Sequence, residues 1–142
     1  MRTRYALLVL VPVLAAALPA DASPRGSLTV NVEGVRSARG QILAELVTPE
    51  PGGGLRRAAA TSAAARAGAL TLRFGDLPPG DYAVRLFHDE DGDGRMKTGA
   101  LGRPAEGFGF SNGARARLGP PSFGEMKVAV AGEARTVARL AY

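Results

Sequence analysis

The chain has 142 residues, no cysteine and a formal net charge of +5. This length suits one domain, and the lack of cysteine excludes both disulfides and a lipid anchor on a signal-peptide cysteine. The basic residues are spread along the sequence, with Arg56-Arg57 as their only adjacent pair, so we expect no nucleic-acid partner.

Residues 1–22 have the pattern of a secretory signal peptide. A positively charged start precedes an apolar run from Tyr5 to Leu18, and Ala20-Asp21-Ala22 supplies the small residues that signal peptidase requires. The apolar run is too short for a transmembrane span. We therefore expect a mature domain over residues 23–142, periplasmic or secreted, with no stable membrane insertion once the signal has been removed.

Alternation of apolar and polar residues, the pattern of a half-buried strand, recurs along the mature domain. The first two such segments, Ser27–Val35 and Gln41–Thr48, are separated by a short turn and predict a β-hairpin. Both faces of the second segment are apolar, which predicts a central place in its sheet. The later alternating segments are Leu70–Phe74, Tyr82–His88, Met126–Val130 and Arg135–Tyr142.

One segment before the third of these strands lacks a clear period. Residues 55–68 are rich in alanine and on propensity alone favour a short helix, but they have no amphipathic face with large side chains. We predict a variable edge segment there. The six or seven short strands, with turns between them, predict an all-β fold: a small antiparallel β-sandwich of the prealbumin or immunoglobulin type.

Residues 88–123 form a long stretch without strand or helix period. Loops beyond about 12–15 residues are mostly functional or disordered. Phe108, Phe110 and Phe123 give this stretch apolar anchors, which favours one long ordered loop. Packing of these rings against the sheet is the simpler interpretation, and a ligand platform is the alternative.

The loop begins with carboxylates in the spacing of a calcium-binding loop. Asp89, Asp91 and Asp93 stand at positions 1, 3 and 5, and the residue at position 7, Arg95, would turn its carbonyl inward. Calcium suits such a site because it takes six to eight hard oxygen ligands in flexible geometry. A solvated Asp/Gly turn is the alternative interpretation.

The second half of the loop departs from an EF-hand. Lys97 stands at position 9, and Ala100 occupies position 12, where a bidentate Glu is expected. A remote acid would have to complete the shell, and we predict Glu106. The expected Ca²⁺ ligands are therefore Asp89, Asp91, Asp93, the Arg95 carbonyl and Glu106.

His88 is the only histidine of the chain. A metal-assisted or histidine-dependent hydrolase would use it with Asp89, Asp91 or Asp93, and would need its ring exposed in a pocket. A buried ring bonded to the backbone would indicate a structural role instead.

Four blocks of sequence together resemble the DUF2141 proteins, a bacterial family of unknown function. The blocks are Leu77–Val84, His88–Gly94, Gly102–Asn112 and Gly119–Phe123. The resemblance implies a signal peptide followed by one small domain, but no activity. That family tends to have an acid in place of Lys97 and a lysine in place of Ala105. Separately, Phe74–Tyr82 is similar to a strand-turn-strand of prealbumin-like sandwich domains.

From these observations we expect a monomeric, non-catalytic binding or structural module of the cell envelope. Its partner would be an envelope or extracellular ligand, and Ca²⁺ would bind in the loop. The hydrolase is the alternative.

Overall fold

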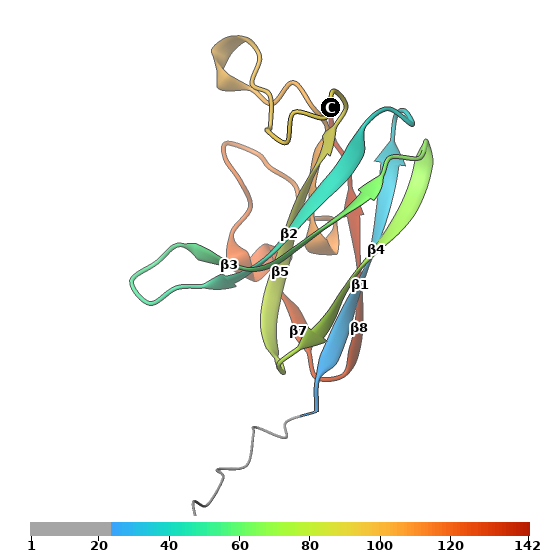
Figure 1. Cartoon of the computed structure of the whole chain (residues 1–142). Helices are drawn as coiled ribbons and strands as arrows, with labels where there is room; N and C mark the ends of the chain where they lie inside the picture. The colour runs from blue at the N-terminus through green and yellow to red at the C-terminus, as the bar shows by residue number, and fades with distance from the viewer. Residues whose placement is uncertain (1–23) are drawn as a thin grey trace, which may run out of the picture.

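A computed structural model describes residues 24–142, and the expected signal peptide, 1–22, lies outside the described residues. Two β-sheets pack face to face (Figure 1). The strands are β1 (Gly26–Val35), β2 (Gln41–Pro49), β3 (Leu55–Ala64), β4 (Gly68–Leu77), β5 (Gly80–Asp89), β6 (Phe108–Phe110), β7 (Val128–Val130) and β8 (Glu133–Arg139). The predicted all-β sandwich is confirmed.

The smaller sheet has the order β4-β1-β8, and the larger has the order β3-β2-β5-β6. β6 and β7 both pair with β5, β6 at Arg85–Phe87 and β7 at Gly80–Tyr82. The remaining elements are one-turn helices at Ala100–Gly102, Ser111–Gly113 and Phe123–Met126 (α1). Within the described part of the chain, no helix is both long and apolar enough to cross a membrane.

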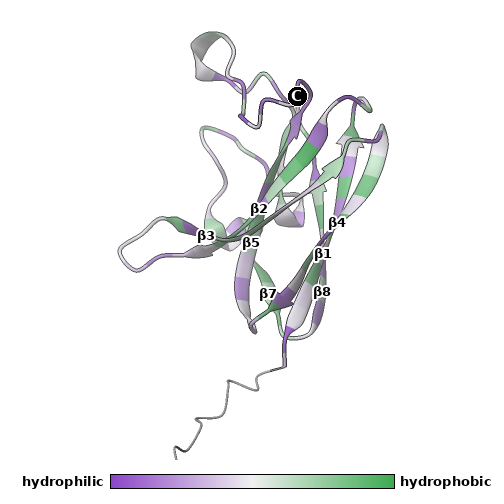
Figure 2. Cartoon of the chain, in the orientation of Figure 1, coloured by the Kyte–Doolittle hydropathy of each residue, from purple (hydrophilic) through white to green (hydrophobic). Residues whose placement is uncertain are grey.

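The core forms because alternate residues of each strand point between the sheets. Leu28, Val30 and Val32 of β1 are fully buried, and Ile42 and Leu46 of β2 face them from the other sheet. In Figure 2 hydrophobic and hydrophilic bands accordingly alternate along the strands. Burial of such aliphatic side chains stabilises the fold by roughly 1.5–3 kcal/mol each.

The predicted hairpin of the first two strands is wrong. β1 pairs with β4 and β8, whereas β2 pairs with β3 and β5, so the two strands lie in different sheets. The apolar residues of β1 and β2 do meet, but they do so across the core, where one sheet packs on the other. β2 is central in its sheet, as its two apolar faces predicted.

The antiparallel description holds for every strand pair except β1 with β8, which is parallel. The number of strands differs from the predicted six or seven as well, because residues 24–142 form eight. Two of these were not predicted as strands: β3, from the alanine-rich segment, and β6, inside the long loop.

The alanine-rich segment forms β3 at the edge of the larger sheet, so its edge position is confirmed and the helical alternative is wrong. β3 is hydrogen-bonded to β2 from Gln41↔Ala64 to Pro49↔Leu55, and most of its residues are exposed. Ladder formation along a long neighbouring strand outweighs the small helix preference of alanine.

The long loop is ordered by contacts along the larger sheet. A Cβ on Gly107 would lie 2.3 Å from the ring of Tyr142, so a larger residue at this position would have to displace the ring. Phe110 and Phe123 pack with Met126 in a second, smaller core on the outer face of this sheet. Packing of these two rings agrees with the simpler interpretation of the aromatic anchors.

Ser111 fills the gap between β6 and β7 along β5. Its side chain is fully buried, and its hydroxyl accepts a hydrogen bond from Val84 N–H at 2.9 Å and donates to the carbonyl of Met126. The hydroxyl therefore replaces a backbone partner that neither short strand supplies.

Candidate functional site

Asp89, the last residue of β5, organises the start of the loop. Its side chain is fully buried. Oδ1 accepts hydrogen bonds from the backbone N–H of Gly92 and Asp93, at 2.9 and 3.1 Å. Oδ2 accepts from Gly94 N–H at 3.0 Å and from Gln41 Nε2 at 3.1 Å. Four donors on two oxygens occupy the carboxylate's usual hydrogen-bonding sites.

Glu106 closes the same loop from its far end. It is buried with 4% exposure. Oε1 accepts from Glu90 N–H and Oε2 from Lys97 N–H, both at 3.1 Å. Each oxygen thus has one protein donor and keeps one further acceptor position.

Asp91 lies on the exposed side of the loop, where Lys97 forms an ion pair with its carboxylate. The ammonium group of Lys97 lowers the pKa of Asp91, and the carboxylate of Asp91 raises the pKa of Lys97. Lys97 is therefore a counter-ion within the loop. The sequence showed that Lys97 cannot be a ligand, but gave no sign of this pairing.

The structure brings together three of the five predicted ligands. Carboxylate oxygens of Asp89, Asp91 and Glu106 lie within 4.8 Å of one another, so the fold brings Glu106 back to the two aspartates at the start of the loop. Asp93 is not part of this group, and its Oδ1 accepts a hydrogen bond from Arg95 N–H at 2.8 Å.

The three carboxylates are the type of ligand that calcium prefers, but not all of their oxygens are free to bind it. All three groups offer hard carboxylate oxygens, which calcium prefers. Glu106 and Asp91 have acceptor positions to spare, whereas Asp89 would have to give up a hydrogen bond. A cation would also replace the ammonium of Lys97, so binding at this group would be weak.

Glu90 ties the loop to the turn after β1. The guanidinium of Arg36 donates to both of its carboxylate oxygens, and Ser37 Oγ donates to Oε1 at 2.8 Å. The hydrogen bonds from Arg36 are the largest cause of a pKa of about 2 for Glu90, against an ordinary 4.5. Arg36 also lies over the ring of Tyr142, 4.3 Å from its centroid.

His88 is fully buried, and both of its ring nitrogens are engaged. Nε2 lies 2.8 Å from the carbonyl oxygen of Arg39, which can only accept, so Nε2 carries a proton. Nδ1 lies 2.8 Å from the hydroxyl of Tyr142, which donates to it when the ring is neutral. The exposed imidazole that the hydrolase alternative requires is not present.

Comparison with known proteins gives a family and no activity. Searches of curated proteins and of solved structures found no match. A family model described as "Uncharacterized protein conserved in bacteria (DUF2141)" matches residues 30–138, which include the whole acidic loop. Because the match covers well over half of the sequence, the chain belongs to the DUF2141 family.

Proposed function

We propose that this protein is a non-catalytic binding or structural module of the cell envelope. The observation that supports it best is the burial of His88, whose two nitrogens are committed to Arg39 and Tyr142. Neighbouring Asp89 is equally buried and holds backbone N–H groups. Asp89 thus stabilises the start of the loop, and His88 links the turn after β1 to Tyr142, so neither side chain faces a substrate. The envelope location rests on the sequence of residues 1–22.

A hydrolase assay tests this proposal. We expect no turnover of chromogenic esters, phosphate esters or glycosides, with or without calcium. Turnover by the wild-type protein would overturn the proposal, and its loss in a folded His88→Gln variant would assign the activity to the buried histidine. Folding of the variant is checked by circular dichroism.

We further propose that the group formed by Asp89, Asp91 and Glu106 binds Ca²⁺ weakly. Two of these carboxylates are buried, and their mutual repulsion is only partly offset by Lys97, so a divalent cation would stabilise the loop. Extracellular calcium sites typically have dissociation constants of about 0.1–1 mM, which suits a site that must displace a lysine.

A thermal melt measures this binding. With a dissociation constant of about 1 mM, 10 mM calcium should stabilise the fold by about 1.4 kcal/mol over the protein in chelator. That corresponds to a rise in Tm of roughly 4–6 °C for a domain of this size. A flat melting temperature up to 10 mM calcium would contradict the proposal.

Asp91→Asn is the specific variant for the cation site, because Asp91 is the exposed member of the group. It should abolish the calcium shift and change the apo melting temperature little, since exposed ion pairs contribute about 0–1 kcal/mol. Asp81→Asn is the matched control, because Asp81 also pairs with a lysine, Lys127, at the surface. The control should keep the full calcium shift.

A further inference from the structure

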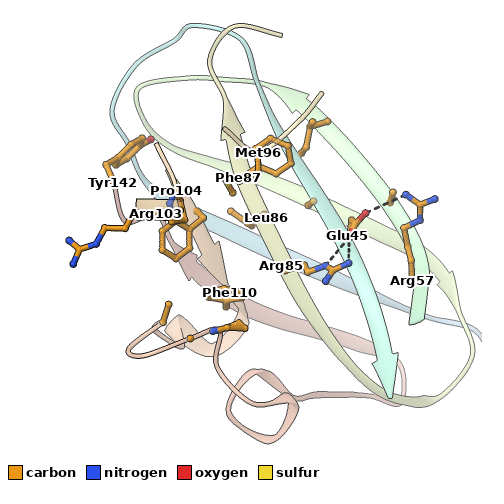
Figure 3. A pocket seen from close by; sticks show the side chains of 18 of the residues that line it. Glu45, Arg57, Arg85, Leu86, Phe87, Met96, Arg103, Pro104, Phe110 and Tyr142 are labelled. Atoms are coloured by element: carbon orange, nitrogen blue, oxygen red, sulfur yellow. Dashed lines mark hydrogen bonds and ion pairs between the residues drawn. The ribbon is translucent and has the colours of Figure 1, made fainter. Parts of the chain in front are cut away.

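A groove of about 1070 Å³ lies on the outer face of the larger sheet. Its floor is formed by β2, β3, β5 and β6, and residues 94–104 and 116–120 contribute to its walls. Figure 3 shows the floor and part of these walls. The volume slightly exceeds the usual range for small-molecule sites, about 300–1,000 Å³, because the groove is open to solvent along its length.

Strand register places one apolar row across this floor. Leu43 of β2 is paired with Phe87 of β5, and Phe87 with Phe108 of β6. All three side chains are half-buried. Met96 adds a thioether from one wall, and Leu118 extends from the other wall fully exposed. These side chains give one part of the groove an apolar surface.

In the next row across the sheet, the two central strands carry charged side chains. Glu45 of β2 is paired with Arg85 of β5, and it also reaches Arg57 of β3. Glu45 Oε2 accepts from Arg85 Nε at 2.8 Å and lies 2.7 Å from Arg85 Nη2. Glu45 Oε1 accepts from Arg57 Nη1 at 3.3 Å. Figure 3 shows Glu45 between the two guanidinium groups.

This Arg57–Glu45–Arg85 cluster holds two arginines with a single acid between them. Arg57 uses only Nη1 in the cluster and Arg85 leaves Nη1 free, so N–H donors remain for a ligand. Arg103 and Arg117 also line the groove, and Glu45 is the one acid among the described residues that do so. The lining is therefore positively charged overall.

We propose that the groove binds an alkyl carboxylate, with the carboxylate at the Arg57–Glu45–Arg85 cluster and the chain along the row Leu43–Phe87–Phe108. Guanidinium groups held in a fixed orientation suit a carboxylate, because they can donate two parallel hydrogen bonds. The apolar row beside the cluster offers the alkyl chain a surface from which water is removed. The proposal names the ligand class of the binding module proposed above and rests on that function, but it uses a different site from the cation group.

An acidic peptide fits this groove less well than an alkyl carboxylate. At the floor, the backbones of β2 and β5 are hydrogen-bonded to strands on both sides, from Glu45↔Ala60 through Glu45↔Arg85 to Arg85↔Phe110. A bound peptide backbone would meet side chains instead of a free strand edge, and its own polar groups would lose water without gaining partners.

Three ligands that differ in one part each test the proposal on wild-type protein. Octanoate carries head and chain, 1-octanol has the chain with a neutral head, and acetate has the head without the chain. Isotope-edited NMR titration should show saturable octanoate binding, with shifts at Leu43, Arg85 and Phe87. Octanol should bind about tenfold more weakly, as expected for a lost charge-assisted hydrogen bond, and acetate should not saturate.

A triple variant, Arg57→Gln with Glu45→Gln and Arg85→Gln, removes the charges and keeps polar side chains of similar length. Octanoate affinity should fall about tenfold and octanol affinity should stay unchanged. Arg135→Gln, on β8 of the other sheet, is the control and should bind octanoate normally. If the triple variant fails to fold, the comparison of the three ligands on wild-type protein still decides the proposal.

Several results would overturn the proposal: no saturable octanoate binding, equal affinity for octanoate and octanol, an unchanged triple variant, or tighter binding of an acidic hexapeptide than of octanoate. Titrations in chelator and in calcium separate the two sites. A calcium shift without octanoate binding would reject the groove alone, whereas octanoate binding without a calcium shift would reject the cation site alone. Chemical conversion of octanoate during the titration would contradict the proposed non-catalytic function.

Discussion

At the scale of single residues, the acidic loop uses its carboxylates as hydrogen-bond acceptors. Asp89 accepts three backbone N–H groups of the turn that follows it, and Glu106 accepts two from the opposite sides of the loop. The same Asp/Gly spacing would appear in the sequence whether these oxygens bound a metal or only N–H groups. That is why the sequence alone predicted Asp89, Asp91 and Glu106 as candidate ligands, together with Asp93 and the Arg95 carbonyl, and could not determine the use of these oxygens.

Glu90 gives the protein a specific acid sensitivity. Its pKa is lowered from 4.5 to about 2, so the unfolded state takes up a proton before the folded state does. The contribution of Glu90 to stability is complete above pH 4.5 and is lost as the pH falls towards 2. We expect a loss of roughly 1–2 kcal/mol across this window, allowing for screening of the half-exposed Arg36.

Urea unfolding between pH 6 and pH 2 measures this loss. Glu90→Gln should be less stable than wild type at pH 6 and approach wild type at pH 2. Glu133→Gln is the control, because Glu133 is exposed and lies 4.0 Å from its partner Arg73. If Glu90→Gln retained the full wild-type pH dependence, another group would be responsible.

Lys97 sets the affinity of the proposed cation site. Because its ammonium group pairs with Asp91, removing it should free a carboxylate for calcium. Lys97→Gln should lower the calcium dissociation constant about three- to tenfold, because the ammonium group no longer competes with the cation for Asp91. Isothermal titration measures this change. Lys127→Gln, which breaks the other aspartate–lysine pair, should leave calcium affinity unchanged.

At the scale of elements, alternation predicted the strands, but pairing could not be predicted from it. Alternation shows which residues of a strand are buried, and β1, β2, β4 and β5 follow it closely. Alternation does not show which strands are neighbours in a sheet, and for this reason the predicted hairpin of β1 and β2 is wrong. β3 was missed because alanine gives no contrast between faces, and β6 because three residues are too few for a period.

Ser111 joins two elements that are each too short to complete the edge of β5. Ser111→Ala should leave the buried Val84 N–H without its partner, which costs about 1–3 kcal/mol. Chemical denaturation measures the change in the free energy of unfolding. Ser62→Ala, at an exposed position of β3, is the control and should fall within about 0.5 kcal/mol of wild type. A neutral Ser111→Ala would mean that water takes over the bond.

At the scale of the whole molecule, the two faces of the larger sheet differ in what covers them. Its inner face is covered by the smaller sheet and forms the main core. Its outer face carries the second core around Met126 at one part and the groove at another. The long loop covers the second core and forms walls of the groove. The sequence predicted that this loop is ordered, but not that it helps to form a groove, because the groove depends on strand register.

Hydrogen exchange should follow the sheet order. Amides of β1 and β5 lie between neighbouring strands and should be the most protected, with exchange that requires global unfolding. In β3, alternate amides that point away from β2 should exchange quickly, since β3 has no further strand partner among the described residues. Protection of all β3 amides would instead indicate that a second molecule pairs with this edge.

The parallel pairing of β1 with β8 has a consequence for the order of folding. Leu28 and Ala134 are neighbours in the sheet although nearly the whole domain separates them in sequence. Closing so long a loop is slow, and contacts between distant residues lower folding rates. β1 therefore acquires its second neighbour only when the C-terminal end of the chain folds onto it. A chain truncated before β8 would lack one strand of the three-stranded sheet, and the β1 edge would expose unpaired backbone N–H and C=O groups.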